Sequence, residues 1–187
     1  MLKIILKVLI VCSFLISGAS HASDYKLAAG DTIRISVYGE EDLSFDELLI
    51  DSSENFEFPY LGNISAKDKT LREVQEELTS GLKGDYLVNP KVTVSIVEYR
   101  NIYVNGVVNK PGAYEYQPDL SVEKAIALAG GFLAKYRKTK GVYLTKSEEV
   151  KGLTQNEIKD LLEKKSEVDL TAEVHPGDTI YVVSSFW

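Results

Sequence analysis

Residue types that commonly carry covalent catalysis are scarce in this chain. Its 187 residues include one cysteine and two histidines. Cys12 and His21 lie in an N-terminal segment that is expected to be removed, which leaves His175 in front of a Pro-Gly turn. A single histidine in a turn is more typical of the surface than of a general base, and the sequence has no Gly-x-Ser-x-Gly motif to supply a nucleophile. The sequence therefore predicts no catalytic residues.

Acidic residues are a second source of chemistry, and they are numerous. The chain holds 28 Asp and Glu residues, which are densest between Glu40 and Glu54. This stretch lacks the central glycine and the alternating oxygen ligands of a calcium loop, so we interpret it as a solvated loop. Two facing carboxylates would suit glycoside hydrolysis, but spacing alone singles out no such pair. We expect no metal ligands and no bound cofactor.

Aromatic side chains are a third source, because the face of a ring can stack on a sugar. The chain has 11 tyrosines and one tryptophan. Several of the tyrosines gather around one predicted hairpin: Tyr99, Tyr103, Tyr114 and Tyr116. Such rings also pack against one another across neighbouring strands, which is the simpler interpretation. Sugar binding by this cluster is the functional alternative.

The composition is that of a folded, acidic protein. Apolar residues make up 44% of the chain and charged residues 26%, with a formal net charge of -7. These values exclude a disordered chain or a coiled coil. Because an acidic chain without basic clusters repels nucleic acid and anionic lipid surfaces, we expect no nucleic-acid partner.

Residues 1–22 have the pattern of a secretory signal peptide. Lys3 and Lys7 flank an apolar run over residues 8–16, and Ser20 and Ala22 supply small side chains at the two positions that a signal peptidase reads. We expect cleavage after Ala22. One alternative is an uncleaved anchor, for which the apolar run is short, and another is lipidation of Cys12, which lacks the small residue expected before it. An exported chain without disulfides fits a Gram-negative periplasm.

A Gly-Asp-Thr-Ile phrase occurs twice, at residues 30–33 and 177–180, and each copy leads into a strand-like alternation. Glycine accepts a positive φ, and aspartate hydrogen-bonds nearby backbone amides. We interpret Asp31 and Asp178 as residues that close turns, because neither has a chemical partner nearby in the sequence. The two phrases bracket nearly the whole exported chain.

Between the brackets, strands and helices alternate in two α+β units. Residues 23–98 contain a short strand at 56–59, a helix from the capping box Thr70-Leu71-Arg72-Glu73 to Gly84, and a strand at 92–97. Residues 99–101 are the expected joint. The first unit thus packs one helix on a sheet.

Residues 99–187 form the second unit. A strand at 102–108 is followed by a type II turn centred on Pro111 and Gly112, and by a returning strand at 113–116. A helix extends from Ser121 to Gly130, and a second begins at the capping box Thr154 to Glu157, between a strand at 142–144 and a last strand from Asp178. A hairpin, a helix across the sheet and further strands is the order of a β-grasp module.

Five segments together resemble the outer-membrane polysaccharide export proteins of the Wza type. Residues 23–98 resemble their polysaccharide export domain, and residues 99–187 resemble the soluble-ligand-binding β-grasp (SLBB) domain that follows it. The segments are Tyr25–Tyr38, Phe58–Ile64, Asn89–Val94, Ile102–Gly112 and Ala125–Gly131. The family's Asp-Gly turn is replaced by Glu54-Asn55, where asparagine would supply the positive φ. The family's lipidated cysteine and its membrane-crossing C-terminal helix have no counterpart.

The resemblance implies a non-enzymatic periplasmic subunit of an exopolysaccharide or capsule export machine, associated with the outer membrane. Its copies would form a ring-like conduit for the polysaccharide, supplied by an inner-membrane polysaccharide co-polymerase. Because the sequence ends at Trp187, we expect a separate outer-membrane β-barrel protein to complete the passage, with Phe186-Trp187 as a candidate contact. The alternatives are a monomeric periplasmic carbohydrate-binding module and a glycan-processing enzyme.

Overall fold

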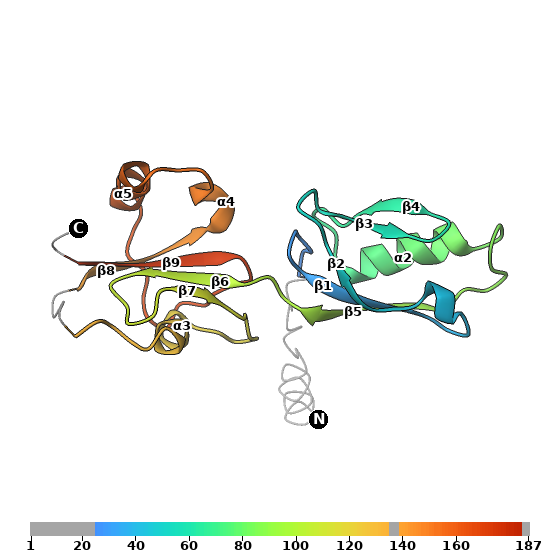
Figure 1. The fold of residues 1–187 in the computed structure, drawn as a ribbon, viewed down its shortest axis with the longest axis horizontal. Helices are drawn as coiled ribbons and strands as arrows, with labels where there is room; N and C mark the ends of the chain where they lie inside the picture. Colours follow the sequence, from blue (N-terminus) through green and yellow to red (C-terminus); the bar gives the residue numbers. More distant parts are fainter. Residues whose placement is uncertain (1–24, 135–138, 185–187) are drawn as a thin grey trace, which may run out of the picture.

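The computed structural model describes residues 25–134 and 139–184, which form two α+β units side by side (Figure 1). The first unit has its core between Leu27 and Val94, and the second between Ile102 and Val183. The α+β class is therefore confirmed. The expected signal segment and Phe186-Trp187 lie outside the described residues. No helix in the described ranges is long and apolar enough to span a bilayer.

The first unit packs one helix against a three-stranded sheet. Strand β1 (Thr32–Val37) lies between β2 (Phe45–Leu49) and β5 (Val92–Glu98), and it is antiparallel to both. The apolar side chains that alternate along β1 are buried against helix α2 (Leu71–Leu82). A separate hairpin of β3 (Asn55–Phe58) and β4 (Gly62–Ser65) completes this core.

Helix α2 begins as the sequence predicts. The Thr70 hydroxyl accepts a hydrogen bond from the Glu73 amide, and the Glu73 carboxylate accepts one from the Thr70 amide at 2.7 Å. These hydrogen bonds lower the pKa of Glu73 to about 2. The capping box therefore stays formed at neutral pH and satisfies amides that the first helical turn leaves unpaired.

The acidic stretch of the first unit is more ordered than the predicted solvated loop. A short 3₁₀ helix, η1 (Glu41–Leu43), leads into β2, so this part of the prediction was wrong. The positive φ of the following turn falls on Glu54, at 62°, and not on Asn55, which begins β3. The turn forms nonetheless, since the Glu54 carbonyl accepts a hydrogen bond from the Ala66 amide.

The second unit is a four-stranded sheet with helices on both faces (Figure 1). The strand order is β7 (Gly112–Tyr114), β6 (Ile102–Gly106), β9 (Asp178–Ser184) and β8 (Thr139–Lys146). The central pair β6–β9 is parallel and the outer pairs are antiparallel. Helix α3 (Val122–Leu128) covers one face, and α4 (Ser147–Val150) and α5 (Gln155–Glu163) lie over the other.

The connection between β6 and β7 differs from the predicted type II turn. That turn needs a positive φ at Gly112, but Gly112 is extended and begins β7. The positive φ, 94°, belongs to Gly106 at the end of β6. A Cβ atom at Gly106 would lie 2.0 Å from the carbonyl oxygen of Val182 on β9. Gly106 therefore allows β6 to end against the neighbouring backbone.

Candidate functional site

The two Gly-Asp turns have the same internal geometry. Asp31 Oδ2 accepts a hydrogen bond from the Ala28 amide at 2.9 Å, and Asp178 Oδ2 accepts one from the His175 amide at 2.8 Å. Both aspartates are buried. Each one closes its turn as predicted, and each turn leads into a central strand of its unit.

Asp31 also joins the two units, a role that its sequence neighbours did not reveal. Its carboxylate accepts hydrogen bonds from the Arg100 amide at 2.8 Å and from the Tyr25 hydroxyl at 2.7 Å. The Arg100 guanidinium donates to the Tyr25 hydroxyl at 2.7 Å and to Asp31 Oδ2 at 3.3 Å. Burial, with a smaller contribution from the Asp31 charge, raises the pKa of Tyr25, so this hydroxyl remains a donor. We call Tyr25, Asp31 and Arg100 the joint cluster.

Both Gly-Asp turns approach the same arginine. A Cβ at Gly30 would lie 3.4 Å from the Cβ of Arg100, and a Cβ at Gly177 would lie 2.5 Å from its Nε. The Nε atom is buried and has no hydrogen-bond partner among the described residues. The repeated phrase thus places two glycines against the side chain at the joint between the units.

Most of the predicted tyrosine cluster packs internally. The Tyr99 ring meets Tyr25 edge-on at 5.0 Å and Tyr116 at 5.2 Å between centroids. Tyr114 packs against the core under α3. The packing interpretation therefore holds for these side chains. Tyr103 is the exception, because it points to the opposite face of the sheet and stays 42% exposed.

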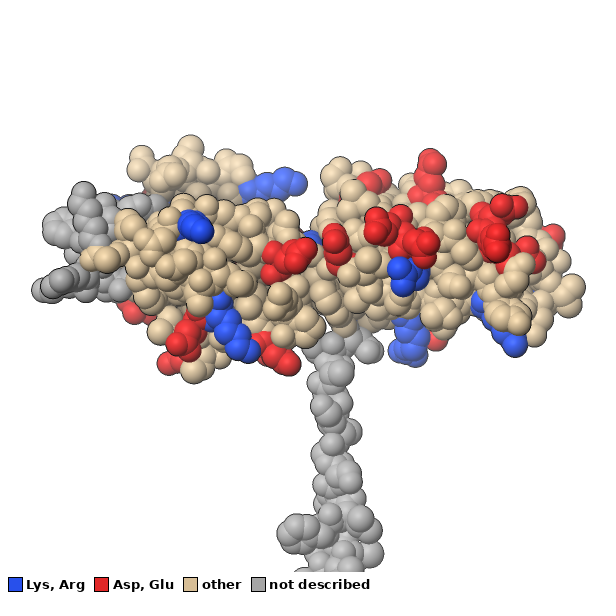
Figure 2. Space-filling model, turned by 60° about the horizontal axis from the view of Figure 1, so that its bottom comes forward, with Lys and Arg blue, Asp and Glu red and all other residues tan. Residues whose placement is uncertain are grey.

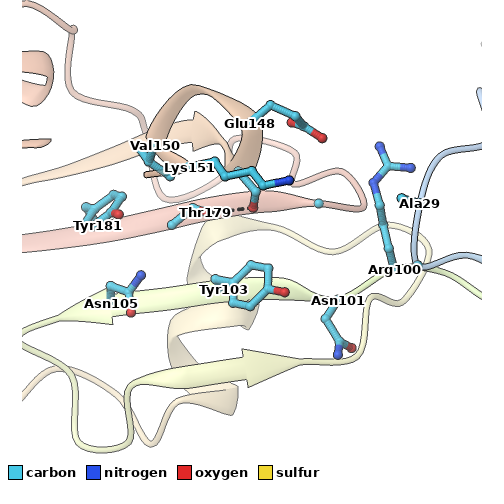
Figure 3. A pocket seen from close by; sticks show the side chains of 13 residues that line it. Ala29, Arg100, Asn101, Tyr103, Asn105, Glu148, Val150, Lys151, Thr179 and Tyr181 are labelled. Atoms are coloured by element: carbon cyan, nitrogen blue, oxygen red, sulfur yellow. Dashed lines mark hydrogen bonds between the residues drawn. The ribbon is translucent and has the colours of Figure 1, made fainter. Parts of the chain in front are cut away.

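Tyr103 lies in a pocket of about 560 Å³ at the joint (Figure 3). The walls come from the first Gly-Asp turn, from the start of β6, from β9, and from α4. The side chains are aromatic, amide, hydroxyl and charged groups: Arg100, Asn101, Tyr103, Asn105, Ser147, Glu148, Lys151, Thr179 and Tyr181. This volume is within the range of about 300–1,000 Å³ that is common for small-molecule sites.

The side chains that line the pocket suit ligand binding better than catalysis. The Ser147 and Thr179 hydroxyls are hydrogen-bonded to each other at 2.9 Å. No histidine is among the described residues that line the pocket. Glu148 is the one carboxylate that lines the pocket, whereas a glycosidase needs two. His175 is half exposed on its turn, with Nδ1 3.8 Å from Asp178 Oδ2. In the described part of the chain, no group of three His, Cys, Asp or Glu side chains is placed to hold a metal ion.

Two known protein families match consecutive regions of the chain. Residues 19–97 match the family described as "Polysaccharide biosynthesis/export protein", and residues 101–152 match the SLBB domain. The chain thus carries a region similar to a polysaccharide export domain, followed by a region similar to an SLBB domain. Members of the polysaccharide export family are transport components rather than enzymes.

Two curated relatives of this chain carry related names. The chain is 34% identical over 130 residues to "Exopolysaccharide production protein ExoF" of Rhizobium meliloti. The matched region covers 62% of this chain and 30% of that relative. It is 26% identical over 137 residues to "EPS I polysaccharide export outer membrane protein EpsA" of Ralstonia nicotianae, covering 60% of this chain and 36% of the relative. The matched region is thus about a third of each relative's length.

Proposed function

We propose that this chain is a non-enzymatic periplasmic subunit of an exopolysaccharide export machine, with copies that assemble into a ring-like conduit to and across the outer membrane. The observation that carries the proposal is the match of a polysaccharide biosynthesis/export family to the first unit, followed by an SLBB match in the second unit of the same chain. The joint cluster supports it physically, because a conduit wall needs units that hold their relative orientation.

The proposed location follows from two further observations. The relative EpsA is named as an outer membrane protein, and residues 1–22 have the charge and apolar pattern of a signal peptide. We propose cleavage after Ala22 and residence in the periplasm at the outer membrane. An inner-membrane polysaccharide co-polymerase and a separate outer-membrane β-barrel protein are the proposed partners, with the polysaccharide itself as substrate.

Deleting the gene in the host tests this function. We expect exopolysaccharide in the medium to fall at least tenfold, and a plasmid copy of the full chain to restore it. The complementing protein should occur in the periplasmic or outer-membrane fraction, with Ser23 at its N-terminus by mass spectrometry. Unchanged polymer release in the deletion strain would contradict the proposal, and a retained Met1 would contradict the cleavage.

The proposed ring separates this function from that of a monomeric carbohydrate-binding module. Native mass spectrometry of the complementing protein, extracted from cells without denaturation, should show a closed homo-oligomer. A species that stays monomeric at every concentration, while still binding polysaccharide, would favour the module instead.

A further inference from the structure

We propose that the pocket at the joint, with the groove that continues from it along the second unit's sheet, binds an uncharged stretch of the exported polysaccharide. This inference rests on the proposed function and assigns a substrate contact to it. It builds on the one member of the tyrosine cluster that does not pack internally, Tyr103.

The shape of the site fits a chain rather than a single compact ligand. A second hollow of about 360 Å³ lies beside the pocket and is lined by Gly106, Pro111, Gln155 and Ile158. The two hollows share Asn105 and Tyr181, so they adjoin along the face of the sheet under α4 and α5. Together they form an elongated track from the joint towards α5. An elongated track suits a polymer that enters at one end and leaves at the other.

The side chains along the track match the chemistry of a sugar. Tyr103 presents an exposed ring that can pack against the C–H face of a pyranose. Asn101 and Asn105 each offer donors and an acceptor, which suits hydroxyl groups that both give and receive hydrogen bonds. The Tyr181 hydroxyl is hydrogen-bonded to the Asn105 side chain, and burial raises the pKa of Tyr181. Figure 3 shows Tyr103 and Asn105 on one strand with Tyr181 on the next.

The charges of the pocket favour an uncharged ligand over an acidic one. Arg100 is a cation in the lining, but the buried Asp31 carboxylate contacts it directly and offsets its charge. Lys151 and Glu148 then contribute one charge of each sign. Away from the pocket, on the face drawn in Figure 2, acidic side chains are spread over the first unit with fewer basic ones beside them. A polyanion would gain little here and would be repelled by the chain's net charge of -7.

The backbone around the track is already fixed before any ligand binds. Tyr103 and Thr179 are paired in the parallel β6–β9 ladder, as are Asn105 and Tyr181. The joint cluster fixes the wall that the first unit contributes. A site whose walls are set in advance loses less conformational entropy on binding.

Titration with fragments of the host's own exopolysaccharide tests the inference. The fragments are made by partial acid hydrolysis and divided by anion exchange into neutral and acidic pools. We expect the neutral pool to bind the full exported chain, as followed by NMR or calorimetry. Tyr103→Thr, which keeps a strand-forming residue, should weaken binding at least tenfold, and Tyr103→Phe should bind within about threefold of the parent. Tyr38→Ala is the matched control, because Tyr38 is an exposed tyrosine of the first unit, outside the track, and should leave binding unchanged.

The inference would be overturned by no binding of the neutral pool, by tighter binding of the acidic pool, or by equal loss in Tyr103→Thr and Tyr38→Ala. A shift in oligomeric state on Tyr103→Thr with unchanged fragment binding would assign the track to contacts between copies, and would also overturn it. The proposed function fails separately, through normal polymer release in the deletion strain. If polymer release requires the gene for this protein but the polysaccharide fragments do not bind at the track, only this inference fails.

Discussion

Replacing Asp31 with asparagine is expected to lower the melting temperature of the first unit by about 10 °C or more. Asp31 is fully buried, and its charge faces the Arg100 guanidinium. Breaking such a pair leaves a cation without its counter-charge and typically costs about 3–5 kcal/mol. Since Arg100 keeps 22% of its side chain exposed, we expect the lower end of that range. A loss of about 3 kcal/mol gives at least the stated shift for a unit of this size.

Asp46→Asn provides the control for that measurement. Asp46 is also paired with an arginine, Arg34, but its side chain is 92% exposed. Exposed pairs contribute about 0–1 kcal/mol, so this variant should lose at most about a third of the stability that Asp31→Asn loses. Scanning calorimetry of the two variants makes the comparison. Equal melting temperatures for Asp31→Asn and Asp46→Asn would mean that the joint cluster does not stabilise the protein.

Replacing Gly106 with alanine should be at least as damaging, although only one methyl group is added. The new Cβ would lie 2.0 Å from the Val182 carbonyl oxygen, and a φ of 94° is strained for any residue with a side chain. Relief requires β6 to move away from β9, which disrupts the central ladder of the second unit. We expect a loss of about 3 kcal/mol or more, seen as a large fall in the midpoint of urea unfolding.

Gly112→Ala separates a general effect of losing glycine from the specific clash. Gly112 lies in the same unit, its φ is not positive, and no atom is within 4 Å of the position of its Cβ. This variant should unfold within about 0.5 kcal/mol of the parent or slightly above it. If both variants lost the same stability, the approach of β6 to Val182 would not explain the need for Gly106.

Local patterns predicted the two Gly-Asp turns and the helices α2, α3 and α5 because the interactions that begin them are local. The two Gly-Asp turns and both capping boxes depend on residues within three positions of each other. Strand β2 was missed because it lies at a sheet edge, where only one side of the strand is hydrogen-bonded to a neighbour and charged side chains such as Asp46 and Glu47 are tolerated. An acidic edge strand and an acidic loop look alike in sequence.

The candidate site depended on contacts between distant residues, which sequence spacing does not give. Arg100 contacts Asp31, which lies 69 positions earlier in the sequence, and its side chain also lies against Gly177, near the C-terminal end of the chain. The alternation along β6 could have placed Tyr103 opposite Ile102 and Val104, since side chains of a strand alternate between faces. It could not show that α4, a helix of four residues without a sequence signal, would wall the pocket above it.

The most direct test of the account is whether exported polymer contacts this protein in living cells. A photocrosslinking amino acid is placed at position 103, and in a parallel strain at position 38, and the protein is purified after illumination under denaturing conditions. The account predicts that polymer-producing cells yield a glycan-bearing product from position 103, that position 38 yields none, and that the product disappears when polymer synthesis is blocked. Protein free of glycan at position 103, recovered from cells that are actively releasing polymer, would contradict it.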